Sequence, residues 1–206
     1  MFWILIVFLI VGIFYPIIGF AAIICMLGPV IMSSFRGRYW CGHYCPRGSF
    51  YDHVISKVTR GRKIPSFLRH PLFRVFMILF IFAMFGVQLY FAWGDWNAMG
   101  KVFWNIILLT TIVGIILGIA YSPRTWCSFC PMGTLSKYVA PRKNKSGFRK
   151  IIVNSSCISC KKCSKVCPMQ LKPFEAKGKD DGYLHPDCIK CEKCVDICPR
   201  KSIKMK

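Results

Sequence analysis

Two runs of cysteines near the end of the 206-residue chain share a spacing that suits metal–thiolate chemistry, C-x2-C-x2-C-x3-C-P. The first run is Cys157, Cys160, Cys163 and Cys167, and the second is Cys188, Cys191, Cys194 and Cys198. Three closely spaced thiolates can wrap one [4Fe–4S] cluster, and in paired runs the fourth cysteine ligates the other cluster. The spacing therefore predicts two clusters, one held by Cys157, Cys160, Cys163 and Cys198, the other by Cys188, Cys191, Cys194 and Cys167.

Zinc and disulfide bonds are the alternatives for these cysteines. Zinc usually takes its four ligands from two C-x2-C pairs and does not need a triplet with a distant fourth cysteine. Disulfides persist in oxidising compartments, whereas free thiolates need a reducing one. The triplet-plus-one pattern favours iron–sulfur clusters over both.

A second repeated motif, R-x-W-C-(x2 or x3)-C-P-x-G-[ST]-[FL], begins at Arg38 and again at Arg124. Its cysteines are Cys41 and Cys45 in the first copy, and Cys127 and Cys130 in the second. Residues three or four apart lie on one face of a helix, so we expect each pair of sulfurs to face one way. Two thiolates under-coordinate a cluster, but the two copies together supply four. We therefore predict that Cys41, Cys45, Cys127 and Cys130 jointly hold a further iron–sulfur cluster, while separate clusters, another metal or no metal stay open.

Other residues beside this motif have a functional and a plainer interpretation. Arg38, Arg47 and Arg124 could offset the negative charge of a thiolate-ligated cluster, or contact lipid headgroups. His43 could replace a thiolate, although a polar interfacial side chain is the default. Cys25 lies in an apolar run, where a free cysteine packs as a small hydrophobe.

The elements that must position these residues are membrane-spanning helices. Apolar residues make up 54% of the chain, the mean hydropathy is +0.44, and the apolar residues come in unbroken runs. Runs of about 20 residues match the thickness of a bilayer core. We expect spans at about residues 1–14, 17–35, 72–92 and 102–121, with a break near Pro16 and a Trp-rich turn at 93–97. A single kinked span over 1–35 is the alternative.

The net charge of +21, from 29 Lys and Arg against 8 Asp and Glu, lies in blocks that flank the apolar runs. Nucleic-acid binding would not need this arrangement, whereas the positive-inside rule predicts it. We therefore expect a multi-pass protein of the cell (inner or cytoplasmic) membrane, with no nucleic-acid partner. So few acidic residues leave little material for paired-carboxylate catalysis.

The sequence divides at a basic linker, residues 142–150. We expect residues 1–150 to form a membrane all-α domain of three to four transmembrane helices. Residues 151–206 should form a small cytoplasmic α+β domain of the bacterial two-cluster ferredoxin type. So short a unit depends on its metal sites for stability, because its hydrophobic core is small.

The order of these motifs resembles the NapH-type membrane polyferredoxins, some relatives of which accompany nitrous oxide reductase maturation and cytochrome oxidase assembly. The resemblance covers nearly the whole chain. It departs from the family where two residues, Ser128 and Phe129, separate the cysteines of the second membrane motif in place of the usual three. The resemblance implies electron transfer between a cytoplasmic donor and a membrane or extracytoplasmic partner, often with quinol chemistry.

We expect an integral membrane electron carrier rather than a stand-alone enzyme; if it is enzymatic, it is an oxidoreductase. The lysine-rich tail suits an acidic ferredoxin-like or flavodoxin-like donor, or a reductase. The acceptor would be a quinone or a membrane redox subunit. Gln88 and Asn105, polar residues within apolar spans, could contact a quinone or bond between helices. The alternatives are a redox or iron sensor and a metal-reducing assembly factor for a respiratory enzyme.

Overall fold

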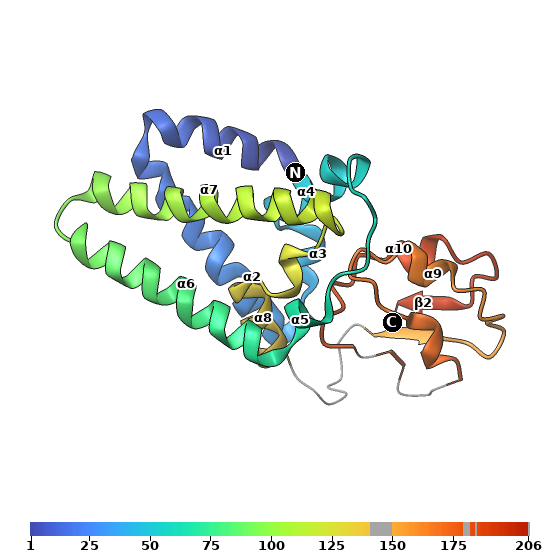
Figure 1. Cartoon of the computed structure of the whole chain (residues 1–206). Coiled ribbons are helices and arrows are strands. Elements are labelled where there is room, and N and C mark those ends of the chain that lie inside the picture. The colour runs from blue at the N-terminus through green and yellow to red at the C-terminus, as the bar shows by residue number, and fades with distance from the viewer. Residues whose placement is uncertain (141–149, 179–181, 184, 206) are drawn as a thin grey trace.

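The computed structural model describes residues 1–140, 150–178, 182–183 and 185–205. Its helices and strands, in chain order, are α1 Phe2–Phe14, η1 Pro16–Ala21, α2 Ala22–Arg36, α3 Tyr39–His43, α4 Pro46–His53, η2 Ile55–Lys57, α5 Ser66–Arg69, α6 Pro71–Phe91, α7 Trp96–Ala120, η3 Trp126–Ser128, α8 Pro131–Val139, β1 Ile151–Val153, α9 Lys162–Lys165, η4 Pro173–Ala176, α10 Lys193–Asp196 and β2 Ile203–Met205. The long helices gather at one end of the molecule and the cysteine-rich tail at the other (Figure 1).

Three helical segments of the described chain are long and apolar enough to cross a membrane: Pro16–Arg36, Pro71–Phe91 and Trp96–Ala120. The predicted span at 1–14 falls short, because the 13 residues of α1 cover only about 20 Å at 1.5 Å per residue, against a bilayer core of about 30 Å. The break near Pro16 is present, since η1 begins there and continues into α2. The described chain therefore has three candidate spans, the lower number of the three to four that we expected.

The third span begins earlier than residue 102. Asp95 ends the turn after α6, and its carboxylate accepts a hydrogen bond from the backbone N–H of Asn97 (2.9 Å). An Asp at this position satisfies one of the free N–H groups at a helix start. The helix therefore begins at Trp96, inside the segment for which we had predicted a turn.

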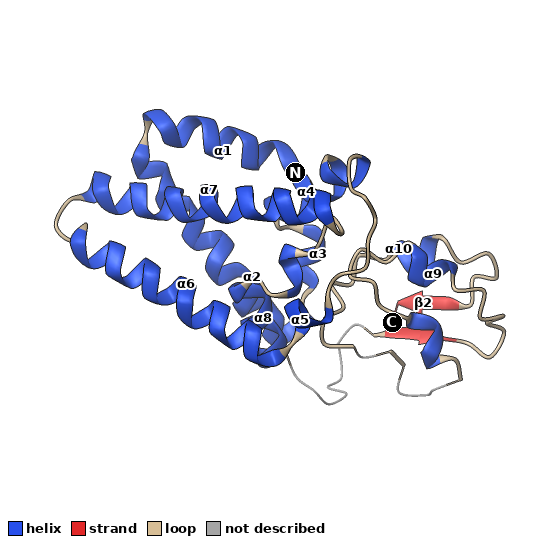
Figure 2. Cartoon of the chain, in the orientation of Figure 1, coloured by secondary structure: helices blue, strands red, loops and turns tan. Residues whose placement is uncertain are grey.

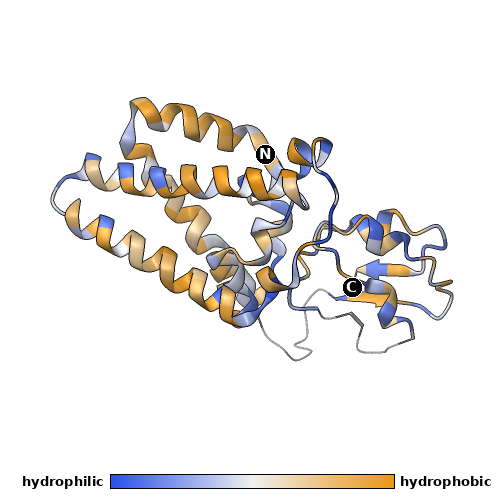
Figure 3. Ribbon diagram, in the orientation of Figure 1, coloured by the Kyte–Doolittle hydropathy of each residue, from blue (hydrophilic) through white to orange (hydrophobic). Residues whose placement is uncertain are grey.

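The helical part packs around the ends of the long helices that face the tail. Tyr51, Ile55, Trp126 and Phe129 are buried there, against side chains from α6 and α7. Farther out the helices stay apolar on their outer faces, as the hydropathy colouring shows (Figure 3). In the window of α6 tested for membrane crossing, only 6% of residues are buried within the protein. Such a surface needs lipid or another apolar partner to cover it.

The tail is a small unit in which strands from its two ends pair with each other. Strands β1 and β2 pair antiparallel, with Ile152 opposite Lys204, and the short helices α9 and α10 lie beside them (Figure 2). Its core contains several of the predicted ligands, namely Cys157, Cys163 and Cys194. Most of the linker predicted at 142–150 lies outside the described residues.

Hydrogen bonds tie the tail to the loops between the helices. Arg69 donates to the carbonyl of Met169 (2.7 Å), and the side chain of Gln170 bonds the backbone of Arg62 and Ile64 (2.9 Å each). These contacts place the segment after Cys167 directly against the helical part.

Candidate iron–sulfur centres

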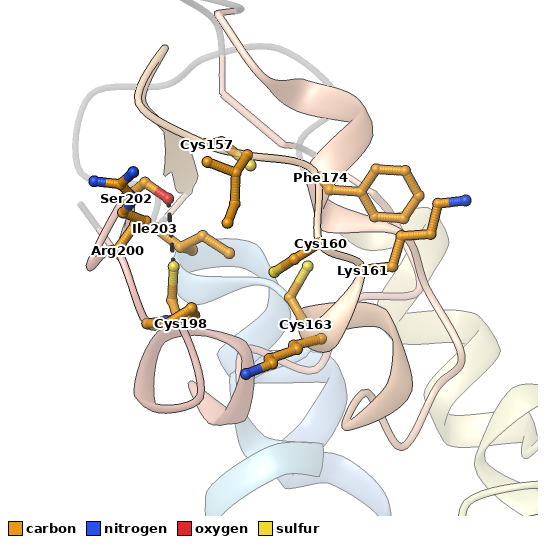
Figure 4. Close-up of a pocket in the computed structure, with 12 residues that line it drawn as sticks. Cys157, Cys160, Lys161, Cys163, Phe174, Cys198, Arg200, Ser202 and Ile203 are labelled. Carbon is orange, nitrogen blue, oxygen red and sulfur yellow. Dashed lines mark hydrogen bonds between the residues drawn. The ribbon is translucent and has the colours of Figure 1, made fainter.

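The first predicted tail set forms one pocket, which we call the distal site. Cys157, Cys160, Cys163 and Cys198 line a space of about 320 Å³. Figure 4 shows the sulfurs of Cys160, Cys163 and Cys198 directed into it from two separate segments of the chain. Cys160 is exposed to solvent, while Cys157 and Cys163 are buried. The distal site therefore lies at the surface of the tail.

The second predicted set lines another pocket, the proximal site, of about 380 Å³. Its cysteines are Cys167, Cys188, Cys191 and Cys194. Apolar residues close it, among them Met169 and Leu171, and the backbone N–H of Leu171 donates to the Cys167 sulfur (3.4 Å). Each pocket is thus lined by three cysteines of one run and the fourth cysteine of the other run, as the spacing predicts.

The backbone of the two runs has positive φ angles at matching positions. All six non-glycine residues with positive φ in the described chain lie in the tail: Ser159, Lys161, Gln170, Lys190, Glu192 and Lys201. The first three recur 31 positions later as the last three, the same interval that separates the cysteines of the two runs. Left-handed residues are costly and persist where surrounding interactions hold them. Turns of this kind can direct several N–H groups into one concavity, which suits an anionic cluster.

The four cysteines of the membrane motif line a third pocket, the membrane chamber, of about 830 Å³. Our expectation that each pair shares a helix face is wrong. Cys41 lies in α3 and Cys127 in η3, whereas Cys45 and Cys130 are the residues immediately before α4 and α8. The prolines after them start new helices, because proline fits the first helical position. Cys45 accepts a bond from Gly48 N–H (3.4 Å), as an N-terminal cap does.

The arginine that opens each membrane motif reaches into the other copy. Arg38 donates to the carbonyl of Cys127, and Arg124 donates to the carbonyl of Cys41, each at 2.7 Å. Arg124 also lies 3.8 Å from the Cys127 sulfur. Arg38 and Arg124 are 3% and 1% exposed, which rules out the lipid-headgroup interpretation for both. They join the two motifs around the chamber.

The glycines of the motif make room for these arginines. A Cβ on Gly48 would lie 2.3 Å from Nη1 of Arg124, and one on Gly133 would lie 2.6 Å from Nη2 of Arg38. The shared arginine and glycine of the R-x-W-C…C-P-x-G pattern are therefore contact partners across the repeat. Sequence analysis noted both residue types but could not pair them.

Each arginine also binds a carboxylate that sequence analysis missed. Arg124 holds Asp52 of α4 through two bonds of 3.0 Å, and Asp52 lies 3.3 Å from Lys193 of the tail. Arg38 and Arg74 both bind Asp187 of the tail, at 3.3 and 2.9 Å. Only 8 acidic residues exist, and Asp187 directly precedes Cys188, which is a signal that could have identified it.

The pKa of Asp187 lies below its ordinary value. Burial alone would raise it, but the hydrogen bond from Arg74 and the charges of Arg38 and Arg74 outweigh burial. The pKa of Asp52 is lowered in the same way, by Arg124 and Lys193 against the effect of burial. Both carboxylates are therefore ionised, and each ties the tail to the helical part.

The proximal site touches the membrane chamber. Cys41 of the chamber packs in one buried cluster with Met169, Leu171 and Ile189, and Cys167 and Cys188 pack against the same cluster. Gly42, which follows Cys41, approaches so closely that a Cβ there would lie 2.2 Å from the carbonyl oxygen of Ile189. The distal and proximal sites likewise share the tail core. The three sites thus form a row: distal, proximal, chamber.

Burial raises the pKa of several of these thiols above the ordinary value of 9.0. Burial raises the pKa of Cys41 to about 12, with Arg38 opposing it, and raises that of Cys188 to about 11. Burial also raises the pKa of Cys194 to about 12. Since a ligating sulfur must be deprotonated, iron binding at these residues must displace protons. At Cys198 burial acts the same way, but hydrogen bonds from Ser202 and its neighbours lower the pKa.

The remaining candidates lie at the edges of these sites. His43 is not among the residues that line the chamber; its ring stacks on Tyr39, with centroids 3.9 Å apart. Cys25 also lines the chamber, and its role as a packing residue stays a prediction. Arg47 donates to Thr110 (2.6 Å) and also lines the chamber.

A site for a single metal ion and a site for a [4Fe–4S] cluster differ in the arrangement of their ligands. Among the residues that the structure describes, no three His, Cys, Asp or Glu side chains converge as ligands of one metal ion. A [4Fe–4S] cluster does not need such convergence, because each of its four irons takes one thiolate. The two four-cysteine pockets of the tail fit clusters through the backbone of their loops.

Comparison with known proteins agrees with these assignments at the level of domains. Residues 18–65 and 104–149, which contain the membrane motifs, match the family model "4Fe-4S binding domain", and residues 149–199 match the "4Fe-4S dicluster domain". The chain is similar to two uncharacterized proteins of Methanocaldococcus jannaschii, MJ0749 and MJ0750. It is 23% identical to the first over 81% of this chain and 70% of that protein, and 24% identical to the second over 71% and 65%. No solved structure matches the chain.

The fold and these matches define the class of the protein. It is an iron–sulfur protein of ferredoxin type that carries 4Fe–4S binding domains. It also has three helices able to span a membrane.

Proposed function

We propose that this protein is a membrane-bound electron relay of the NapH type, with two [4Fe–4S] clusters in the tail and a third iron–sulfur cluster in the membrane chamber. When bound, a [4Fe–4S] cluster takes up and gives away single electrons, and its surroundings set its potential. The chain's own residues would hold the three sites in order and tune them. The ligands would be the three four-cysteine sets.

The observation that carries this proposal is the direct contact between the proximal site and the chamber. The chain brings Gly42, between two chamber cysteines, against Ile189, between two proximal cysteines. Asp187 and Asp52 fix the same contact from both sides through buried arginines. A sensor or a storage protein would not need its separate sites packed against each other, whereas an electron relay does.

The exposed rim of the distal site supports an acidic donor. Lys161, Lys162 and Arg200 line the site and are exposed around the exposed Cys160, and Ile158 beside them is 57% exposed. An apolar patch within a positive rim suits a transient electron-transfer partner with acidic residues around its own redox centre. We infer a ferredoxin-like or flavodoxin-like protein, or a reductase, in this role.

The dependence of the reduction rate on ionic strength tests this proposed donor. Reduction of the protein by an acidic one-electron carrier should slow as ionic strength rises, because screening weakens the attraction between exposed charges. Lys161→Glu should slow it at low salt, and Lys57→Glu, a charge reversal outside the site, should not. A rate that is independent of salt in the wild-type protein contradicts this donor surface.

An apolar pocket that adjoins the chamber supports a lipophilic acceptor. About 590 Å³ lies between side chains of α1, α2 and α7, and Cys45 and Arg47 line it as well as the chamber. Apolar walls with one polar group suit an amphipathic ring compound such as a quinone. Neither Gln88 nor Asn105 lines it. A membrane redox subunit covering this side is the other acceptor that we consider.

The basic segments beside the spans support a cytoplasmic position of the tail in the cell membrane, through the positive-inside rule. Arg60, Arg62 and Lys63 lie in the loop between η2 and α5. Cysteine labelling from either side of sealed vesicles would test this orientation.

Iron and labile sulfide analysis of the anaerobically purified chain tests the relay first. Three clusters require about ten to twelve irons per chain, while the tail alone requires about eight. A preparation that holds zinc and no iron would contradict the whole proposal.

Reduced protein should then be reoxidised by a quinone analogue in detergent, and Leu5→Trp, which fills the apolar pocket, should slow this step. Ile10→Trp on the exposed face of α1 is the matched control.

A further inference from the structure

The two tail sites are built from the same repeat, but the sulfur of the fourth cysteine meets different groups in each. At the distal site the Ser202 hydroxyl lies 3.3 Å from the Cys198 sulfur, as the dashed line in Figure 4 shows. Ser202 is 2% exposed. When the sulfur ligates iron it has no proton, so the hydroxyl must be the donor. Ser202 thus supplies a buried O–H···S bond to the distal site.

The corresponding position of the proximal site has no hydroxyl. The interval of 31 residues that aligns the runs pairs Cys198 with Cys167 and Ser202 with Leu171. Leu171 offers the Cys167 sulfur its backbone N–H at 3.4 Å, and its side chain belongs to the buried apolar cluster. At this position of the repeat the Cys198 sulfur therefore has a side-chain hydroxyl beside it, whereas the Cys167 sulfur has only a backbone N–H and an apolar side chain.

Charge and exposure differ in the same direction. Arg200 and Lys161 line the distal site, where the repeat has Met169 and Glu192 at the proximal site. Lys190 at the proximal site opposes this trend, since the distal site has Ser159 in its place. Arg200 and Lys161 are exposed, so salt screens both charges, whereas Lys190 is 6% exposed and opposes them. The buried hydroxyl of Ser202 is therefore the difference in favour of the distal site that screening does not weaken.

Hydrogen bonds to sulfur, positive charge and solvent exposure all favour the reduced form of a cluster, which carries one more negative charge. We propose that the tail sites have unequal reduction potentials, with the distal one higher, and that Ser202 is the positioning group that sets the difference. This inference rests on the proposed relay. The step is the gain of one electron by the site, in which the thiolates remain deprotonated and the Ser202 hydroxyl keeps its proton.

Such a difference has a consequence for the relay. At partial reduction the electron resides at the surface of the tail, beside the basic rim, rather than against the membrane chamber. Electrons would then enter and leave the protein through the distal site, and transfer toward the chamber would require a second electron or an acceptor of higher potential.

Reciprocal substitutions in the full-length protein test the proposal, with a redox titration followed by electron paramagnetic resonance. Ser202→Ala should lower the higher of the two tail potentials by about 59 mV, which corresponds to a tenfold change in the one-electron reduction equilibrium. Leu171→Ser should raise the lower potential. Ser202→Thr keeps the hydroxyl and should leave both potentials unchanged.

These measurements distinguish a failure of the Ser202 inference from a failure of the proposed electron relay. A chain without iron refutes the proposed function, whereas a fully loaded chain tests Ser202. If Ser202→Ala in a loaded protein changes neither potential, or changes only the lower one, the inference is wrong. If Ser202→Ala loses iron, the other two variants test the inference. It is wrong if Ser202→Thr lowers the higher tail potential, or if Leu171→Ser leaves the lower tail potential unchanged.

Discussion

Gly42→Ala tests whether the proximal site must touch the membrane chamber. The new methyl group would lie 2.2 Å from the carbonyl oxygen of Ile189, which is backbone and cannot rotate away. To reach ordinary van der Waals contact the two segments must separate by about 1 Å, and overpacking of this kind costs roughly 1–3 kcal/mol. Alanine is the better helix former, so any destabilisation comes from the contact and not from α3.

Two measurements follow from this geometry. Magnetic coupling between the reduced proximal and chamber sites should weaken, because it falls with distance, while the iron content stays at the wild-type level. Loss of visible absorbance on heating in detergent should also begin at a lower temperature. Gly86→Ala is the matched control, because nothing lies within 4 Å of its Cβ position. If Gly42→Ala and Gly86→Ala both behave like the wild type, the two segments are not in contact and the row of sites is broken.

Three further results are expected. Cys45→Ser should lose the iron of the chamber. Cys25→Ser, in the same pocket but outside the predicted ligand set, should retain that iron. Iron analysis of both variants tests this, and equal loss would make Cys25 a ligand. Asp187→Asn leaves two buried guanidinium groups without their carboxylate, which should destabilise the protein by about 3–5 kcal/mol at neutral pH. Since the pKa of Asp187 is lowered, its contribution is complete above the ordinary value of 3.8 and is lost as the pH falls through the lowered value. The difference in unfolding free energy between wild type and Asp187→Asn should therefore shrink only in acid, and a difference that shrinks near pH 7 would contradict the assignment. Because burial raises the pKa of the Cys41 thiol, loading the apoprotein with iron and sulfide should release protons and grow weaker as the pH falls, which titration in weak buffer measures.

The predicted ligand sets of the tail and of the membrane motif each appear as one pocket in the structure. Their ligation of iron is still to be tested by the iron analysis above. The secondary structure around them was less predictable. Cys41 and Cys45 do not share a helix, because Pro46 starts a new helix and makes Cys45 its cap. The third span begins at Trp96 and not at residue 102, because Asp95 caps it.

The amino-acid sequence alone determined which cysteines share a pocket and where the apolar spans lie, because both are encoded locally. The cysteines of one loop must be a few residues apart to surround a cluster, and a span needs an unbroken apolar run, so each leaves its mark on consecutive residues. The tertiary structure alone decided which groups surround those sulfurs. Asp187 meets Arg38 and Arg74 across more than 110 positions of the chain, and Gly42 meets Ile189 across a similar separation. Such pairs depend on how the tail packs against the helices, and no local spacing records that packing.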